Sequence, residues 1–480
     1  MRCKCNLTIQ QMILYLVTHV PATNKQLMKQ ALLALLPGFV RRRIERSDAL
    51  QRVLGNVSWL LLDKLLRLGV GLIVTAWIAR YLGPEQFGIW SYALSFAALF
   101  GTFATLGLDG IVVRELVKDP ASRDEILGSA FILKLVGGLI ALAMSAGLFA
   151  LLKPEDTLSF YLIILAAGIF VLQSLDAVDL YFQAHVQSKY SVIARDTAFV
   201  LLSLGRVALI LSGATLIVFA GAGLAEAVLA AVLLVLAFRI RGESVFRWRA
   251  NLRTARSLLR DSWPLILSGL VIMVYMRIDQ IMIGEMIGKA AVGTYAAAVR
   301  ISEIWYFVPV AIAGSVYPAI VELRHSNPER YRLRMQQLYD MLTWLSIGAG
   351  IIISLLSGFI IHLLYGEEFR DAAGILIVHV WTGVFVSLGV ASGKHLLAEN
   401  LTKIAFYRSL CGALVNVGLN FVLIPQYGAI GAAFATLISQ ALATYIFDFT
   451  NAATRTMFMM KTQSLFFVNA LTPRRGADDH

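Results

Sequence analysis

The chain has few charged residues and few cysteines for its length. Asp, Glu, Lys and Arg make up 15% of its 480 residues, whereas soluble domains carry about 25%. Cys3 and Cys5 fall in a segment that we expect in the reducing cytoplasm, and Cys411 falls in an apolar run, so no disulfide framework is implied. The sequence also lacks metal-ligand spacing, a nucleophile elbow and a phosphate-binding glycine loop. It therefore predicts no metal site, no cofactor and no catalytic residue.

Long apolar stretches dominate what is present, and hydrophobic residues make up 58% of the chain. A helix rises 1.5 Å per residue, so about 20 apolar residues cross the ~30 Å hydrocarbon core of a bilayer. Twelve stretches meet this length: 55–79, 87–108, 127–152, 158–180, 191–212, 214–238, 262–286, 291–320, 338–364, 372–394, 403–424 and 428–450. The sequence predicts an all-α integral membrane protein with about 12 transmembrane helices.

Basic residues lie mainly on alternate connections between these stretches. The connections after the odd-numbered spans carry four basic residues, Arg80, Lys153, Lys289 and Arg370, whereas the other set carries 19 when the basic residues at the adjoining span ends are included. Because positively charged loops stay in the cytoplasm, we expect both termini there. The net charge of +12 is then explained by topology and by contact with anionic membrane lipids, without a nucleic-acid partner.

The predicted domain organisation has five parts. They are a cytoplasmic N-terminal segment, 1–52, with an interfacial helix at 30–46, a six-helix lobe, 53–239, a basic cytoplasmic linker, 240–261, a second six-helix lobe, 262–450, and a cytoplasmic tail, 451–480. Met28 offers a second start that leads directly into MKQALLALLPGFVRRRIER. Residues 1–27 are therefore either a true N-terminus or an extension beyond the natural start.

The two lobes show a weak internal repeat. A shift of 205 residues lays Gly83 on Gly288, Gly88 on Gly293, and Gly223 on Gly428. Each lobe has an even number of spans, so both begin on the same side, which predicts a parallel repeat around a central cavity. The glycines themselves are expected to serve close helix packing and tight turns. Pro309 should kink the long eighth span.

Charged residues inside apolar spans are costly and normally face a partner or a wet cavity. The basic ones are Lys64, Arg67, Lys134, Arg206, Arg277 and Arg300, and the acidic ones include Asp63, Asp176, Asp179, Glu226, Asp279 and Glu303.

Two interpretations of these charges stay open. In the first, neighbours neutralise each other on one helix face, as Asp63 with Arg67 and Arg300 with Glu303 could. In the second, the six cations line a cavity for an anionic head group, since arginine offers phosphate a planar fork of donors. Asp279 or Glu226 is a candidate for binding a coupling proton or sodium ion, although structural pairing would also account for both.

Four segments resemble the bacterial polysaccharide-export flippases, the Wzx-like group of the multidrug/oligosaccharidyl-lipid/polysaccharide exporter superfamily. They are RLGVGLIVTAWIARYLGPEQFGIWSYALSF (67–96), GLDGIVVREL (107–116), RIDQIMIGEMIGKAAVGTYAAAVRISE (277–303) and LIPQYGAIGAAFATLISQAL (423–442). The likeness covers most of 53–450. It implies two six-helix bundles and a substrate class, an undecaprenyl-pyrophosphate-linked oligosaccharide moved from the inner to the outer leaflet.

The resemblance also implies a basic cavity lining, a role that falls on Arg277 and Arg300 because both lie inside matching segments. The other four cations rest on their expected depth alone. A polysaccharide polymerase and a chain-length regulator are the protein partners to consider, and the bacterial inner (plasma) membrane is the expected location.

Three other functions are alternatives to glycan export. Multidrug/cation antiporters share the twelve spans, but the export of cations favours an acidic cavity. Lipid II flippases usually carry two further helices, for which this chain has no apolar span. A membrane glycan polymerase or ligase needs a substantial outer loop, and every outer connection here is short. We therefore expect a transporter and not an enzyme.

Overall fold

The computed structural model describes residues 48–399 and 401–466, and its regular elements over these ranges are all α- or 3-10 helices. The described residues form two compact units. The first comprises 48–71, 103–144 and 164–264, and the second comprises 72–102, 145–163 and the described residues from 265 onward. The lobes expected at 53–239 and 262–450 stay a prediction.

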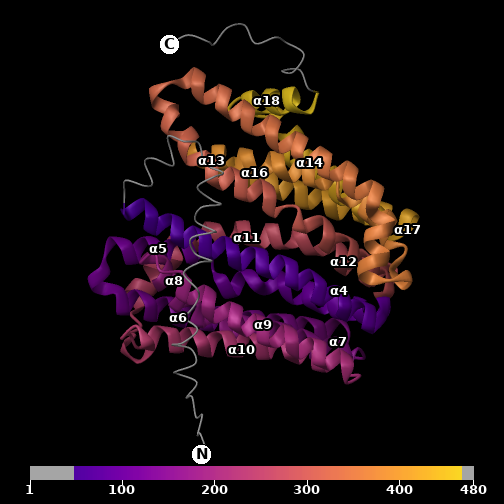
Figure 1. The fold of residues 1–480 in the computed structure, drawn as a ribbon, viewed down its shortest axis with the longest axis horizontal. Helices are drawn as coiled ribbons and strands as arrows, with labels where there is room; N and C mark the ends of the chain where they lie inside the picture. Colours follow the sequence, from indigo (N-terminus) through magenta and orange to yellow (C-terminus); the bar gives the residue numbers. More distant parts are fainter. Residues whose placement is uncertain (1–47, 400, 467–480) are drawn as a thin grey trace, which may run out of the picture. The chain divides into compact units, whose positions relative to one another are not determined.

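The first unit takes its helices from the N-terminal half. They are the opening part of α4 (Asp48–Thr105), α5 (Asp109–Lys118), η1 (Pro120–Ser122), most of α6 (Arg123–Leu152), the end of α7 (Thr157–Leu172), η2 (Gln173–Asp176), α8 (Ala177–Ala184), α9 (Lys189–Leu211), α10 (Leu216–Ile240) and η3 (Val245–Arg247). Helices α9 and α10 pack side by side (Figure 1). Leu127, Phe182 and Phe238 belong to the buried core of this unit.

The second unit contains the rest. Its elements include most of α11 (Leu252–Met286), α12 (Lys289–Ile304), α13 (Phe307–Ser326), α14 (Pro328–Tyr365), η4 (Glu367–Phe369), α15 (Ala372–His379), α16 (Thr382–Ala398), α17 (Thr402–Thr444), η5 (Ile446–Phe449) and α18 (Arg455–Leu465). The short helix α18 packs against the beginning of α14 (Figure 1). Met335, Leu338 and Leu388 lie in the buried core between these helices.

The protein is a multi-pass membrane protein, as its hydropathy predicts. Within the described ranges, nine helical segments are long and apolar enough to span a bilayer. The segments at 58–118 and 403–449 each contain two of the predicted spans, because α4 breaks at Gly83 and α17 breaks at Gly428. Helix α9 covers the remaining predicted span and is less apolar, because it carries Arg195, Asp196 and Arg206.

The glycines of the internal repeat make turns and close helix contacts, as expected. Gly83 (φ 74°, ψ 171°) and Gly288 (φ 132°, ψ 173°) both adopt positive φ before a helix, a conformation that costs glycine little. Gly88 and Gly293 pack against each other, since each Cβ would meet the other's backbone nitrogen at about 3 Å. The match of Gly223 with Gly428 is wrong, because Gly223 lies inside α10 whereas Gly428 (φ 63°) breaks α17.

Two other expectations concern single segments. The kink expected at Pro309 is a break at residues 305–306, between α12 and α13, with Pro309 in the first turn of α13. A first-turn proline loses no intrahelical hydrogen bond, since that N–H has no partner within the helix. The predicted interfacial helix at 30–46, the question of residues 1–27 and the end of the tail, 467–480, lie outside the described residues.

Candidate functional site

Asp279 lies in the middle of a buried polar cluster in the second unit. Its side chain is 4% exposed. The Tyr295 hydroxyl donates to Asp279 Oδ2 (2.8 Å), the Thr436 hydroxyl donates to the same oxygen (2.5 Å), and the Asn420 amide donates to Oδ1 (2.6 Å). Among the described residues no cation pairs with this carboxylate. Four segments distant in sequence meet here, α11, α12 and the two halves of α17.

The cluster contains an unsatisfied acceptor. The Asn420 amide also donates to Asn416 Oδ1 (3.1 Å), and Asn420 Oδ1 is buried without a hydrogen-bond partner. A carboxylate, a hydroxyl and amide oxygens are the ligands that hard monovalent cations accept, and a bound cation or proton would remove the cost of burying the Asp279 charge. The cluster is therefore chemically suited to a small cation.

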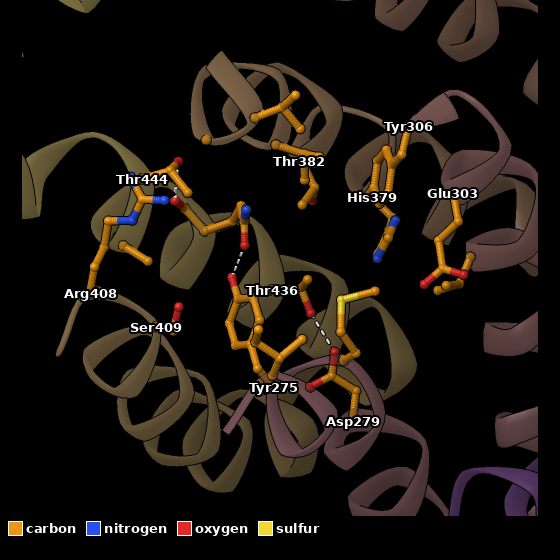
Figure 2. Close-up of a pocket in the computed structure, with 18 of the residues that line it drawn as sticks. Tyr275, Asp279, Glu303, Tyr306, His379, Thr382, Arg408, Ser409, Thr436 and Thr444 are labelled. Atoms are coloured by element: carbon orange, nitrogen blue, oxygen red, sulfur yellow. Dashed lines mark hydrogen bonds between the residues drawn. The ribbon is translucent and has the colours of Figure 1, made fainter. Parts of the chain in front are cut away.

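A cavity of about 390 Å³ opens beside Asp279. Tyr275, Glu303, His379 and Arg408 contribute to its lining, and Figure 2 shows Asp279 and Glu303 toward one side and Arg408 with Thr444 toward the other. The Tyr275 hydroxyl donates to Gln440 Oε1 across the cavity. The cavity is thus acidic near α11 and α12 and basic near the first part of α17.

The first unit holds a separate network of paired charges. Arg67 pairs with Asp63 (2.5 Å), with Asp196 (3.4 Å) and more distantly with Glu226 (3.9 Å), whereas Arg206 pairs with Glu226 (2.8 Å). The predicted pairing of Asp63 with Arg67 is confirmed. Three carboxylates and two guanidinium groups leave these five residues with no excess of positive charge.

The remaining cations predicted in the first unit differ from each other. Lys134 is 2% exposed and pairs with Asp109 (2.5 Å). Lys64 is exposed, and it makes no ion pair with any residue that the structure describes. Buried Lys134 therefore has its charge compensated by Asp109, whereas Lys64 has no ion-pair partner among the described residues.

Arg277 and Arg300 lie near Glu303 in the second unit. Both are within electrostatic reach of its carboxylate, but neither forms an ion pair with it, so the expected pairing of Arg300 with Glu303 is wrong. The exposed Arg300 guanidinium donates only a long hydrogen bond to the Thr75 hydroxyl (3.4 Å). Half-buried Arg277 makes no ion pair in the described part of the chain. Neither arginine lines the cavity beside Asp279.

Some of the residues that build this site could not be predicted from their charges. Asn416 and Asn420 are neutral and fully buried, and the only signal is that two amides four residues apart share one face of an apolar span. Arg408 falls inside the predicted eleventh span, 403–424, and it lies buried in α17.

Comparison with known proteins places this chain in a family. The family described as polysaccharide biosynthesis protein matches residues 53–324, which is more than half of the chain. The chain belongs to the polysaccharide biosynthesis protein family. A second family, MatE, matches residues 264–422. The polysaccharide biosynthesis region contains all eight predicted site residues, and the MatE region contains Asp279, Asn416 and Asn420.

Relatives of this polysaccharide biosynthesis protein support the same grouping. Agl15 of Haloferax volcanii, named a probable low-salt glycan biosynthesis flippase, is 25% identical over 79% of each chain. AglR of the same organism, named a probable flippase, is 28% identical over 78% of this chain and 79% of its own. The solved structure of the lipid II flippase MurJ in an inward closed conformation shares the fold, with a TM-score of 0.64 at 16% identity over 88% of this chain and 93% of that one.

Proposed function

We propose that this protein is a flippase that moves an undecaprenyl-pyrophosphate-linked oligosaccharide from the inner to the outer leaflet of a bacterial plasma membrane. The family and the flippases among its relatives support a lipid-linked glycan as the substrate. The observation that carries the proposal is the pair Arg277 and Arg300, two arginines in apolar spans that lack an ion-pair partner among the described residues. Fixed positive charge of this kind offsets the desolvation of a pyrophosphate.

The six predicted cations contribute unequally to this proposed role. Arg277, Arg300 and Lys64 form no ion pair with a described carboxylate, although Glu303 is within electrostatic reach of both arginines. Arg67, Arg206 and Lys134 are paired in this conformation, so they would contact the head group only after exchanging their carboxylate partners. The unpaired three are therefore the primary candidates for binding the head group.

Asp279 is the proposed coupling site for a proton or a sodium ion. A buried carboxylate surrounded by hydroxyls and amides gains a counter-ion when the cation binds and loses it when the cation leaves, so occupancy changes the free energy of the surrounding helices. Glu226, the other candidate, is already paired with Arg206 (2.8 Å). This pairing makes Asp279 the stronger candidate.

Transport by alternating access of two lobes, 53–239 and 262–450, completes the proposed mechanism. Tyr92 and Glu285 lie on spans two and seven, and the Tyr92 hydroxyl donates to Glu285 (2.7 Å). Crosslinking the pair Tyr92→Cys and Glu285→Cys with a short bifunctional thiol reagent should abolish transport, whereas the same reagent on either single variant should not. Undiminished transport in the crosslinked protein would contradict alternating access.

The same proposal includes the orientation of the protein in the membrane and its partners. Both termini lie in the cytoplasm, the protein acts as a transporter and not an enzyme, and a polysaccharide polymerase and a chain-length regulator are its candidate partners. The function as a whole is tested in a flippase-deficient bacterium, by measuring lipid-linked glycan in the outer leaflet with and without this protein. Restoration of outer-leaflet glycan is expected; failure with a panel of glycans, together with export of cationic drugs, would favour a drug antiporter.

A further inference from the structure

The cavity beside Asp279 ends, on its other side, at a buried positive charge. Arg408 is 9% exposed, and its guanidinium donates to the Ser392 hydroxyl (2.9 Å). In the described part of the chain it forms no ion pair. Its side chain contributes to the cavity lining together with Ser409 and Thr444 (Figure 2). A buried arginine without a bound carboxylate is costly, because burial removes its hydration and no opposite charge replaces it.

A second buried cation lies just beyond Arg408. Lys461 and Asp448 are both 0% exposed and form an ion pair (2.5 Å), and the Lys461 ammonium also donates to the Thr444 carbonyl oxygen (2.6 Å). Asp448 is within electrostatic reach of Arg408. Two buried cations thus share one carboxylate, and this group of three, the Arg408–Asp448–Lys461 triad, carries an excess positive charge.

Helix α18 brings Lys461 into this position from beyond the last span. The Trp344 indole N–H donates to the Ser464 carbonyl oxygen (3.0 Å), and the Gln336 amide donates to the Ser464 hydroxyl (2.9 Å). These bonds hold α18 against α14. The triad therefore lies where the polypeptide leaves the last membrane span.

Polar groups connect the two charged regions along α17. Thr436, Gln440 and Thr444 follow each other at intervals of four residues, so they share one side of α17, and all three line the cavity; Asp448 follows in η5. Thr436 donates to Asp279, and Thr444 receives the Lys461 hydrogen bond on its carbonyl oxygen. A cation that leaves Asp279 along this polar side of the cavity approaches the triad.

We propose that the Arg408–Asp448–Lys461 triad is an electrostatic seal that prevents the coupling cation at Asp279 from leaking through the cavity toward the end of the last span. The inference rests on the proposed coupling role of Asp279. Like charges repel strongly where water is excluded, so a cation in the cavity is held near Asp279 and away from the triad. Ion movement is then tied to the conformational change that opens the lobes.

The seal is tested by ion leak into vesicles that contain the purified full-length protein and no glycan substrate. Uptake of ²²Na⁺ and the fluorescence of trapped pyranine report sodium and proton entry separately. Wild type and Arg408→Lys should be tight. Arg408→Met removes the excess charge and should raise the leak of one of the two cations about tenfold, and Arg408→Gln provides a second neutral variant if the methionine variant does not fold.

The control variant replaces the Lys461–Asp448 ion pair and keeps the positive charge of Arg408. Apolar residues of similar volume often replace a buried pair without loss of stability, so Lys461→Met/Asp448→Leu should fold, retain the Arg408 charge and stay tight. A leak in this double variant as large as that of Arg408→Met would show loosened packing and overturn the electrostatic seal. No leak in Arg408→Met or Arg408→Gln would overturn it as well.

A third variant tests whether the leaking cation passes through the Asp279 site. If the cation passes through Asp279, Arg408→Met/Asp279→Asn should be tight again, and a persistent leak would contradict the route. The leak assay contains no glycan, so its outcome is independent of the proposed transport function. Ion-driven glycan transport that survives Asp279→Asn would refute the coupling role of Asp279. The leak rates of the Arg408 variants report on the seal alone.

Discussion

Gly88 and Gly293 cross at van der Waals contact through their backbones, and each occupies the same position in one copy of the internal repeat. A Cβ on Gly88 would lie 1.7 Å from the Lys289 carbonyl oxygen, and a Cβ on Gly293 would lie 2.0 Å from the Pro84 carbonyl oxygen. The same shift of 205 residues that relates the glycines also relates Pro84 to Lys289. The contact is therefore reciprocal, as at an interface with two-fold symmetry.

This crossing predicts that even one methyl group is not tolerated. Because the clashing atoms belong to the backbone, they cannot rotate away, so Gly88→Ala should lower the free energy of unfolding by at least about 1–3 kcal/mol. Gly69 lies in α4 before the break at Gly83, with no atom within 4 Å of its Cβ position, and Gly69→Ala should be neutral or stabilising by up to about 1 kcal/mol. The thermal unfolding midpoints of Gly88→Ala and Gly69→Ala in detergent are compared. Equal midpoints would show that the helices do not cross closely at Gly88 and Gly293.

Replacing Asp279 should separate stability from coupling. Asp279→Asn keeps the shape of the side chain and removes a buried charge that lacks a described ion-pair partner, so the folded protein should be at least as stable as wild type. The variant should lose the dependence of glycan transport on a sodium or proton gradient. Initial rates in vesicles with and without each gradient measure this dependence, and Thr436→Val should weaken it in the same direction. Retained dependence in both variants would place coupling elsewhere.

Hydropathy and charge were sufficient to predict the membrane spans and the Asp63–Arg67 pair, because these depend on neighbours in sequence. The repeat likewise predicted the turns at Gly83 and Gly288. The partners of Asp279 were not predictable, since Tyr295, Asn420 and Thr436 come from other spans and only the packed fold decides which faces meet. The same reason applies to Lys461, whose burial depends on the docking of α18 against α14.

The Arg206–Glu226 pair allows a test of whether Arg206 holds the fold or the substrate. Removing one partner of this half-buried pair leaves the other charge without its nearest counter-ion, so Arg206→Leu should lower the free energy of unfolding by up to about 3 kcal/mol. Arg206→Leu/Glu226→Leu should recover most of this loss. If the double variant also transports glycan normally, Arg206 is structural; if it folds but does not transport, Arg206 acts on the substrate or in coupling.

The docking of α18 should depend on pH through Lys461. Burial lowers the pKa of this amine to about 8, although Asp448 opposes the shift, whereas its pKa in the unfolded chain is about 10.4. Between these values the unfolded state binds a proton that the folded state does not, so the stability contributed by this group rises with pH from about 8 to 10. Hydrogen-exchange protection of α18, corrected for intrinsic rates, measures the trend, and Lys461→Met/Asp448→Leu should remove it. A falling trend in wild type would contradict the assigned shift.

The proposed sidedness of the chain predicts from which side of the membrane its loops are accessible. A reporter enzyme active only outside the cytoplasm should be inactive when fused after the α10–α11 linker, which contains Arg247, Arg249 and Arg253, and active when fused in the connection at residues 366–371. Fusions that report the opposite sides would reverse the proposed orientation and with it the direction assigned to transport.

Arg277 and Arg300, which form no ion pair with a described residue, are proposed to bind the anionic head group of a lipid-linked glycan. The most direct measurement compares outer-leaflet glycan in a flippase-deficient bacterium expressing wild type, Arg277→Ala, Arg300→Ala or the two Arg→Lys variants at matched protein levels. We expect restoration by wild type, loss in both alanine variants and partial activity in the lysine variants, because lysine keeps the charge without the planar fork of donors. Full restoration by both alanine variants would contradict it.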